Sequence, residues 1–213
     1  MSETQSSREE SKRETREALI LAGIDAFAED GLDTPSLDGI CARAGRTRGA
    51  FYVHFRDRED FVVQVMDRVI RGFVAMAMGD EAEERGLIPT VHRYVAMIDA
   101  AQSALAAGLD PSRAAATLQS LTLQRALEAC SRSDAVRFRF VELVEDAIRQ
   151  VADETRLGQS DRTVRTDIDA TSLATLLVAI ALGAGLAIET GVRFDLQRIS
   201  PALLELISPS KRS

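Results

Sequence analysis

Five arginines lie close together between residues 43 and 58 of this 213-residue chain. The same segment holds one acidic residue, so its local charge is +4 in a chain whose formal net charge is −7. Contacts with phosphate groups supply a large share of the affinity of DNA-binding proteins, and clustered basic residues make those contacts. The segment therefore predicts a surface that binds nucleic acid. Its charged residues are Arg43, Arg46, Arg48, Arg56 and Arg58, with Asp57.

Other chemistry finds little support in the sequence. His54 and His92 are the two histidines, no cluster of metal ligands stands at a familiar spacing, and no glycine-rich phosphate loop is present. The carboxylates are scattered in the way that helix surfaces carry them. We therefore predict no catalytic residue, no metal site and no cofactor. An enzyme built on an all-helical fold is the alternative of a different class.

Residues 33–61 must form the elements that hold these arginines. The hydroxyl of Ser36 can cap the first free amides of a helix, and apolar residues then recur at helical spacing as far as Ala44. Gly45 supplies the left-handed residue that ends this helix. A second helix begins near Thr47. The segment therefore predicts two short helices joined by a tight turn.

The second helix has two different faces. Phe51 and Phe55 stand four residues apart and share one face, which we expect to be buried. Arg48, Gly49 and Tyr52 point elsewhere, so that face is free to meet a partner. The arrangement is typical of a recognition helix that lies against DNA.

The same stretch carries many residues at fixed offsets. They are Gly31, Ser36, Ile40, Ala44, Gly45, Thr47, Gly49, Ala50, Phe51, Tyr52, His54, Phe55, Arg58, Glu59, Asp60 and Phe61. This pattern resembles the DNA-binding domain of the TetR family of bacterial transcriptional regulators, over roughly residues 14–68. Two positions depart from the family pattern: Arg46 replaces a small aliphatic residue, and Arg58 replaces a lysine, which keeps the charge but changes its geometry.

The resemblance implies which residues contact DNA. These are Ser36, Thr47, Arg48, Gly49, Ala50, Tyr52, His54 and Arg58, and Arg43 and Arg46 would add charge for phosphates. Arg48 is the best candidate for reading a base, because its planar fork can hold O6 and N7 of one guanine. Phosphates are the expected partners of the hydroxyls of Ser36 and Thr47, and of the side chains of Tyr52 and His54. The small Gly49 and Ala50 let the helix approach the groove.

The N-terminal part of the chain completes a three-helix unit. Residues 1–11 are rich in serine and are expected to be a disordered arm, and a helix from Lys12 to about Asp30 should bury Leu21 and Phe27. Arg8, Lys12, Arg13 and Arg16 have two interpretations: they could reach the DNA, or they could form a solvated face together with the glutamates between them. A connecting helix should run from residue 58 to about Met78, capped by Asp57.

The composition, with few prolines and aromatic residues, favours an all-α fold. We expect a helix-turn-helix domain at 12–78 and a larger helical domain at 79–213 that binds a ligand and forms a dimer. Its helices are predicted near 89–107, 111–131, 134–155 and 169–190, with a polar loop at 156–168. A short final helix at 195–207 is expected to be interrupted by Pro201.

The helix at 169–190 is apolar almost all round, so most of its surface must be covered. We expect helices 134–155 and 169–190 to pair with their copies in a second chain, as the resemblance implies. The alternative is that both belong to a monomeric core. The apolar run is too short for a confident membrane span, and residues 1–17 form no signal peptide, so a cytoplasmic protein is expected. Cys41 and Cys130 are expected to be reduced thiols.

These expectations combine into one function. The resemblance implies a dimeric transcriptional repressor that binds a palindromic operator in double-stranded DNA, and releases it when an unidentified small molecule binds residues 79–213. A ligand-binding or architectural protein that keeps the DNA-binding unit without regulating transcription is the remaining alternative. A promoter reporter assay separates the two.

Overall fold

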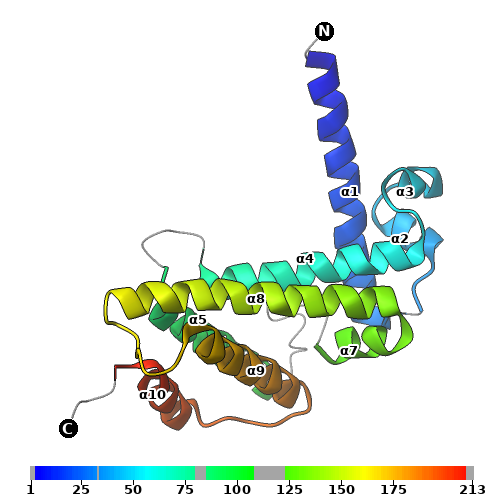
Figure 1. The fold of residues 1–213 in the computed structure, drawn as a ribbon. Coiled ribbons are helices and arrows are strands. Elements are labelled where there is room, and N and C mark those ends of the chain that lie inside the picture. The colour runs from blue at the N-terminus through cyan, green and yellow to red at the C-terminus, as the bar shows by residue number, and fades with distance from the viewer. Residues whose placement is uncertain (1–2, 33, 80–84, 108–122, 210–213) are drawn as a thin grey trace. The chain divides into compact units, whose positions relative to one another are not determined.

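The computed structural model of the protein describes residues 3–32, 34–79, 85–107 and 123–209 (Figure 1). Within these ranges all the regular secondary structure is α-helical. The predicted all-α fold is confirmed.

The helices divide into two compact units. The first unit comprises Met1–Val69 and Ser120–Phe140, and the second comprises Ile70–Gln119 and Val141–Ser213. The division falls inside two long helices, α4 (Arg58–Met78) and α8 (Asp134–Ser160). The sequence placed one boundary at residue 78, whereas the structure adds a later segment, which includes α7 (Leu123–Arg132), to the N-terminal unit.

Helix α1 spans Glu3–Asp30, so the described part of the predicted disordered arm is helical. No glycine or proline interrupts the sequence between residues 3 and 22. Lys12 also pairs with Glu9 at 3.6 Å, one helical turn away, which stabilises such a helix. The helix ends at Gly31, whose φ of +81° suits glycine. Leu21, expected to be buried, is exposed, and its neighbours Leu19 and Ile20 are buried instead.

Helices α2 (Leu37–Arg43) and α3 (Arg48–His54) form the predicted pair of short helices. The Ser36 hydroxyl accepts a hydrogen bond from the Gly39 amide at 3.0 Å, and the Thr47 hydroxyl accepts one from the Ala50 amide at 3.2 Å. Both are N-caps, which satisfy amides that the helix itself leaves free. Gly45 makes the turn between the helices with a φ of +63°. The predicted start of the second helix at Thr47 is confirmed.

Four phenylalanines form the centre of the first unit. Phe51 of α3 and Phe55, the residue that follows this helix, are 0% and 1% exposed, and their ring centroids lie 5.2 Å and 4.8 Å from that of Phe61 in α4. Phe27 of α1 lies 5.9 Å from Phe61. Because these side chains come from three helices, their burial fixes the direction in which α3 presents its other face.

Gly23 of α1 allows the phenylalanines to pack this closely. A Cβ at this position would lie 2.4 Å from Cζ of Phe61, so a larger residue would displace the ring. Asp57 caps α4 as predicted, because its carboxylate accepts a hydrogen bond from the Asp60 amide at 2.8 Å. The first unit is therefore held by a close-packed core and by capped helix starts.

The second unit is built from α5 (Leu87–Ala106), α9 (Ala170–Glu189), α10 (Leu196–Ile207) and the remaining parts of α4 and α8. Its core contains Leu87, Val91, Val164, Leu173 and Ile207. The Tyr94 hydroxyl of α5 donates a hydrogen bond to the Ala181 carbonyl of α9 at 2.6 Å, which joins these two helices.

Two predictions for the helices of this unit are wrong. Helix α8 continues to Ser160 instead of ending near residue 155, and α10 continues through Pro201 without interruption. Proline lacks the amide that would bond the carbonyl of Gln197, but both residues are exposed, so water can solvate that carbonyl. Most of the helix predicted at 111–131 lies outside the described residues.

Helix α9 is unusually apolar. Among the described helices it is the one with the length and mean hydropathy, 2.1, of a membrane-crossing segment, a test that core helices of soluble proteins also pass. Leu176 and Ile180, four residues apart, are 50% and 41% exposed. An apolar face of α9 is therefore uncovered in the single chain.

Candidate DNA-binding surface

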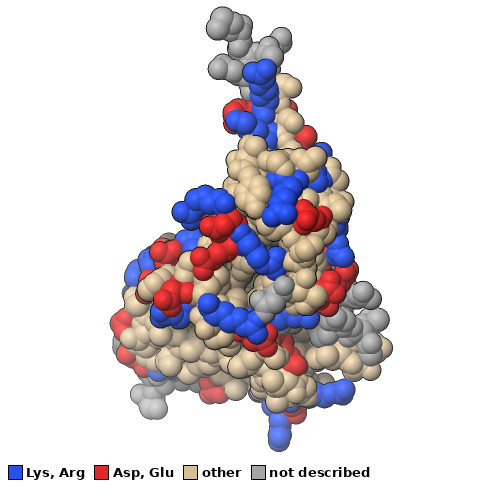
Figure 2. Space-filling model, turned by 90° about the vertical axis from the view of Figure 1, so that its right-hand side faces the viewer, with Lys and Arg blue, Asp and Glu red and all other residues tan. Residues whose placement is uncertain are grey.

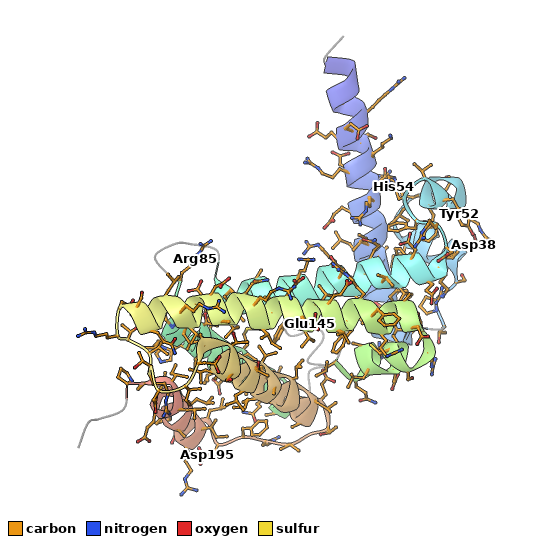
Figure 3. The ribbon with its side chains drawn as sticks, viewed as in Figure 1. Asp38, Tyr52, His54, Arg85, Glu145 and Asp195 are labelled. Carbon is orange, nitrogen blue, oxygen red and sulfur yellow. The ribbon has the colours of Figure 1, made fainter. Side chains whose placement is uncertain are left out.

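Helix α3 displays one polar face outward. Phe51 and Phe55 are buried, and Arg48, Gly49 and Tyr52 are exposed, with Tyr52 at 50%. Figure 3 shows Tyr52 and Asp38 together at the outer side of α2 and α3, whereas His54 lies on the side toward α1. The sequence predicted this two-faced helix, and its geometry has the form needed for a helix that enters a DNA groove.

Arg48 is the first residue of α3 and its side chain is held by two neighbours. Its Nη1 atom lies 3.4 Å from Oδ2 of Asp38 in α2, and its guanidinium carbon lies 6.0 Å from the centre of the Tyr52 ring. Interaction with the Tyr52 side chain, followed by the charge of Asp38, raises the pKa of Arg48. Because the ion pair is solvent-exposed, it is weak: it orients the guanidinium, but another partner can replace Asp38.

Gly49 and Ala50 leave the start of α3 open. A Cβ placed on Gly49 would meet only the Thr47 hydroxyl oxygen, at 3.8 Å, and Ala50 is half-buried. The backbone at this point can therefore approach another surface closely. The caps Ser36 and Thr47 are exposed, and each hydroxyl that accepts an amide bond still has a proton to donate to a phosphate.

His54 lies at the end of α3 and is half-buried. Burial lowers its pKa, and the positive charges of Arg16 and Lys12 in α1 lower it further. The Arg16 guanidinium carbon lies 5.8 Å from the centre of the Phe55 ring. The end of α3 and the basic residues of α1 therefore form one positively charged neighbourhood.

Two of the arginines that were predicted to contact DNA bind other residues of the protein. Arg43 donates to Oε2 of Glu29 at 2.7 Å, and Arg58 donates to the carbonyls of Pro35 and Leu32 at 2.7 Å and 2.6 Å. Burial lowers the pKa of Arg58. Arg58 therefore holds the connection between α1 and α2, and its contact with phosphate stays a prediction, as does that of Arg43.

Arg46 lies exposed in the turn before α3. Its backbone amide donates to the Cys41 carbonyl at 2.8 Å, so the turn keeps a defined shape although its usual small residue is replaced. The position leaves the guanidinium directed away from the core. Its phosphate contact also stays a prediction.

Asp38 is the residue of this surface that the sequence reasoning missed. It stands ten residues before Arg48, on a different helix, and no local pattern joins the two positions. The exposed Val53 of α3 adds an apolar group to the same surface. A methyl-bearing side chain there can touch the methyl group of a thymine.

Figure 2, which views the molecule from the side of α3, shows lysine and arginine side chains along the projecting start of α1. Acidic side chains lie among them. The surface combines an open helix start, hydroxyl donors and arginines, which together can bind phosphates and read the edge of a base.

The comparison with protein families supports this assignment. Residues 19–65 match the model described as bacterial regulatory proteins, tetR family. The matched segment contains all ten predicted contact residues, from Ser36 to Arg58. The HTH-type transcriptional repressor BepR of Brucella suis is 44% identical over 55 residues, which are 26% of this chain and 26% of that protein. The match thus spans about a quarter of the length of that curated relative.

Solved structures show the fold of nearly the whole chain. The reduced form of Escherichia coli NemR has a TM-score of 0.68 at 19% identity and covers 93% of this chain and 99% of its own. A complex of SmeT with triclosan has a TM-score of 0.58 at 24% identity, and covers 90% and 88%. At these identities the likeness establishes the arrangement of helices alone.

Proposed function

Because residues 19–65 match the model of the TetR family of bacterial regulatory proteins, we propose that this chain belongs to that family and is a DNA-binding transcriptional regulator and not an enzyme. It acts as a repressor, binding a palindromic operator as a homodimer and releasing it when a small molecule binds the second unit. This activity places it in the cytoplasm with the chromosome.

The observation that carries the proposal is the two-faced helix α3. Two fully buried phenylalanines fix the helix in the core, and Arg48 and Tyr52 stand on its exposed side. Since the arginine side chain is oriented by Asp38 but remains in solvent, it can exchange that partner for a guanine. Phosphate contacts from Ser36, Thr47, Tyr52 and Arg46 would then fix the position of the helix in the groove.

The exposed apolar face of α9 supports the dimer. Burying Leu176 and Ile180 against the same face of a second chain removes apolar surface from water. Gly183 lies in the same exposed stretch, and nothing stands within 4 Å of the place where its Cβ would be. Two copies can therefore approach closely there.

The end of α4 supports a response to a ligand. Arg93 of α5 donates to the carbonyls of Ala77 and Met78 at 2.9 Å and 2.5 Å, so the last turn of α4 is fastened to the second unit. The other end of α4 begins in the first unit. A ligand that shifts α5 would therefore pull on the helix that carries the DNA-binding unit. The SmeT structure contains triclosan, which makes a small apolar molecule a reasonable class of effector.

Binding to DNA tests the proposal directly. Full-length protein is titrated against a duplex selected by the wild type from a random library, at several salt concentrations, with Arg48→Ala and the control Arg198→Ala. We expect wild-type affinity to fall steeply with salt, and Arg48→Ala to lose about tenfold to a hundredfold in discrimination between selected and scrambled duplexes. Arg198 is an exposed arginine of α10, so its variant should behave as wild type.

Tyr52→Phe separates positioning from base reading in the same assay. Loss of the phenol should weaken binding to selected and scrambled duplexes alike. Wild-type protein that selects no duplex, or that binds DNA without salt dependence, would overturn the proposed function.

A further inference from the structure

The first half of α1 projects beyond the three-helix unit, and most of its charges follow two lines, with Glu9 and Arg13 between them. Arg8, Lys12 and Arg16 recur every four residues along one side of the helix, and we call them the basic stripe. Glu10, Glu14 and Glu17 follow another line. At 100° per residue the two lines lie about 160° apart, on nearly opposite sides of the helix. Residues 7–14 are exposed.

Contacts at the base of the projection fix which way the basic stripe faces. Arg16 donates to Oε1 of Gln64 in α4 at 2.7 Å and lies over the Phe55 ring, while Glu17 pairs with Arg68 of α4 at 3.3 Å. These contacts lock the rotation of α1. Phe55 is the residue that follows α3, so the contact of Arg16 with its ring means that the stripe runs past the end of that helix.

We propose that the projecting part of α1 is a second DNA-binding element, in which Arg8 and Lys12 bind phosphates beside the groove that α3 enters. The proposal rests on the proposed function, and it resolves the two interpretations that the sequence left open for these residues. Arg16 and His54 join the basic stripe to the recognition surface. Because α1 is continuous from Glu3 to Asp30, the arm is a rigid extension of the core.

The dimensions and charges of the arm suit a duplex. Arg8 and Arg16 are eight residues apart, about 12 Å along the helix, which is about the axial length of three to four base pairs. The pair between Lys12 and Glu9 is 3.6 Å long and mostly exposed, so phosphate can displace the glutamate at little cost. The glutamates of the opposite line face away, where they do not oppose the DNA.

The test uses full-length protein and the duplex selected by the wild type. The double variant Arg8→Gln/Lys12→Gln removes the two outer cations, and glutamine keeps the helix propensity. We expect affinity to fall on the order of tenfold, and the slope of log affinity against log salt to become shallower by about 2 for each protomer. Circular dichroism checks that the helix content is unchanged.

A matched pair of single variants tests the face of the helix. Lys12→Gln and Arg13→Gln remove the same charge from adjacent residues, but Arg13 is turned about 100° away from Lys12. Lys12→Gln should weaken binding several-fold, and Arg13→Gln should stay near wild type. Ethylation of single phosphates should weaken DNA binding by the wild type at some sites where it does not affect binding by the double variant.

Four results would overturn the inference while leaving the proposed function intact. Three are unchanged affinity and salt slope in the double variant, equal effects of Lys12→Gln and Arg13→Gln, and identical ethylation patterns. The fourth is a double variant that loses binding to phosphatidylserine vesicles but keeps wild-type affinity for DNA, which would assign the stripe to a membrane surface. Failure of the wild type to select DNA is a different outcome, which removes the proposed function together with the inference.

Discussion

Helices α3 and α9 each present an exposed face, but the two faces have opposite chemistry. Phe51 of α3 and the adjoining Phe55 are buried, and the helix exposes Arg48 and Tyr52 to solvent. Helix α9 offers Leu176 and Ile180, although it belongs to the second unit and has an apolar core of its own to pack against. Water solvates an exposed arginine well, whereas exposing an apolar stripe to water is unfavourable.

The difference shows which surface is complete in one chain. The face of α3 needs no partner for stability, so it can remain free until DNA arrives. The face of α9 costs free energy while it stays in water, which favours permanent association with a second copy. One recognition helix reads few base pairs, and a stable dimer supplies the second one. In the proposed dimer, the apolar helix would set the number of recognition helices, and the polar helix would set the sequence that they read.

The largest effect is expected from breaking the buried side of α3. Phe51→Ala removes a fully buried ring that contacts Phe55 and Phe61, and should lower the free energy of unfolding by about 3–5 kcal/mol. Urea denaturation followed by circular dichroism measures the change. The control is Val53→Ala, since Val53 lies on the exposed side of the same helix, and a change within about 0.5 kcal/mol is expected. Equal losses in the two variants would mean that α3 has no buried face.

The sequence was sufficient to predict this buried side. Phe51 and Phe55 stand one turn apart, Ser36 and Thr47 precede helix starts, and Gly45 occupies a turn position with a left-handed backbone. These features lie close together in the sequence, and the periodicity of apolar residues can predict structure only from such local spacing. The same reasoning placed α5, α9 and the cap of α4 at Asp57 correctly.

Other features depend on contacts between distant residues, which spacing does not reveal. Arg58 was expected on the DNA-facing surface, but the carbonyls of Leu32 and Pro35 bind its guanidinium. Asp38 was not singled out because its partner Arg48 is on another helix. Residues 3–11 were expected to be disordered because they are polar, although no residue there breaks a helix. Polarity predicts exposure, and exposure is compatible with helix.

The second largest effect is expected from breaking the apolar side of α9. Leu176→Glu would bury a carboxylate in the proposed contact and should weaken dimerisation by about 3 kcal/mol, or roughly a hundredfold. Sedimentation equilibrium measures the mass as a function of concentration, and operator affinity should fall with the loss of dimer. Gln197→Glu adds the same charge on the exposed surface of α10 and serves as the control. A Leu176→Glu protein that stays as dimeric as wild type would place the contact elsewhere.

A smaller effect is expected at the exposed side of α3. Asp38→Asn removes the carboxylate that orients Arg48 and repels phosphate, so affinity for scrambled DNA should rise a few-fold. Discrimination should fall by up to about tenfold, because the arginine is less well oriented toward its base. Competition titrations with selected and scrambled duplexes measure both quantities. If discrimination were unchanged while general affinity rose, Asp38 would act through its charge alone.

The smallest effect is expected from pH, and it should separate the two helices. Burial, followed by the charges of Arg16 and Lys12, lowers the pKa of His54 in the folded protein below the 6.5 of the unfolded chain. The folded state therefore favours the neutral imidazole. Its contribution to stability is fully present above pH 6.5 and is lost as the pH falls through the folded-state pKa.

Urea denaturation of wild type and His54→Gln between pH 5.5 and 7.5 tests this expectation. The wild type should lose more stability than the variant as the pH is lowered, and the difference between the two isolates the imidazole. Helix α9 carries no ionisable side chain from Ala170 to Ile188, so dimerisation through its apolar face should change little over the same range. If dimerisation followed the pH and the stability difference between wild type and His54→Gln did not, the titrating group would lie in the subunit contact. The division of chemistry between α3 and α9 would then fail.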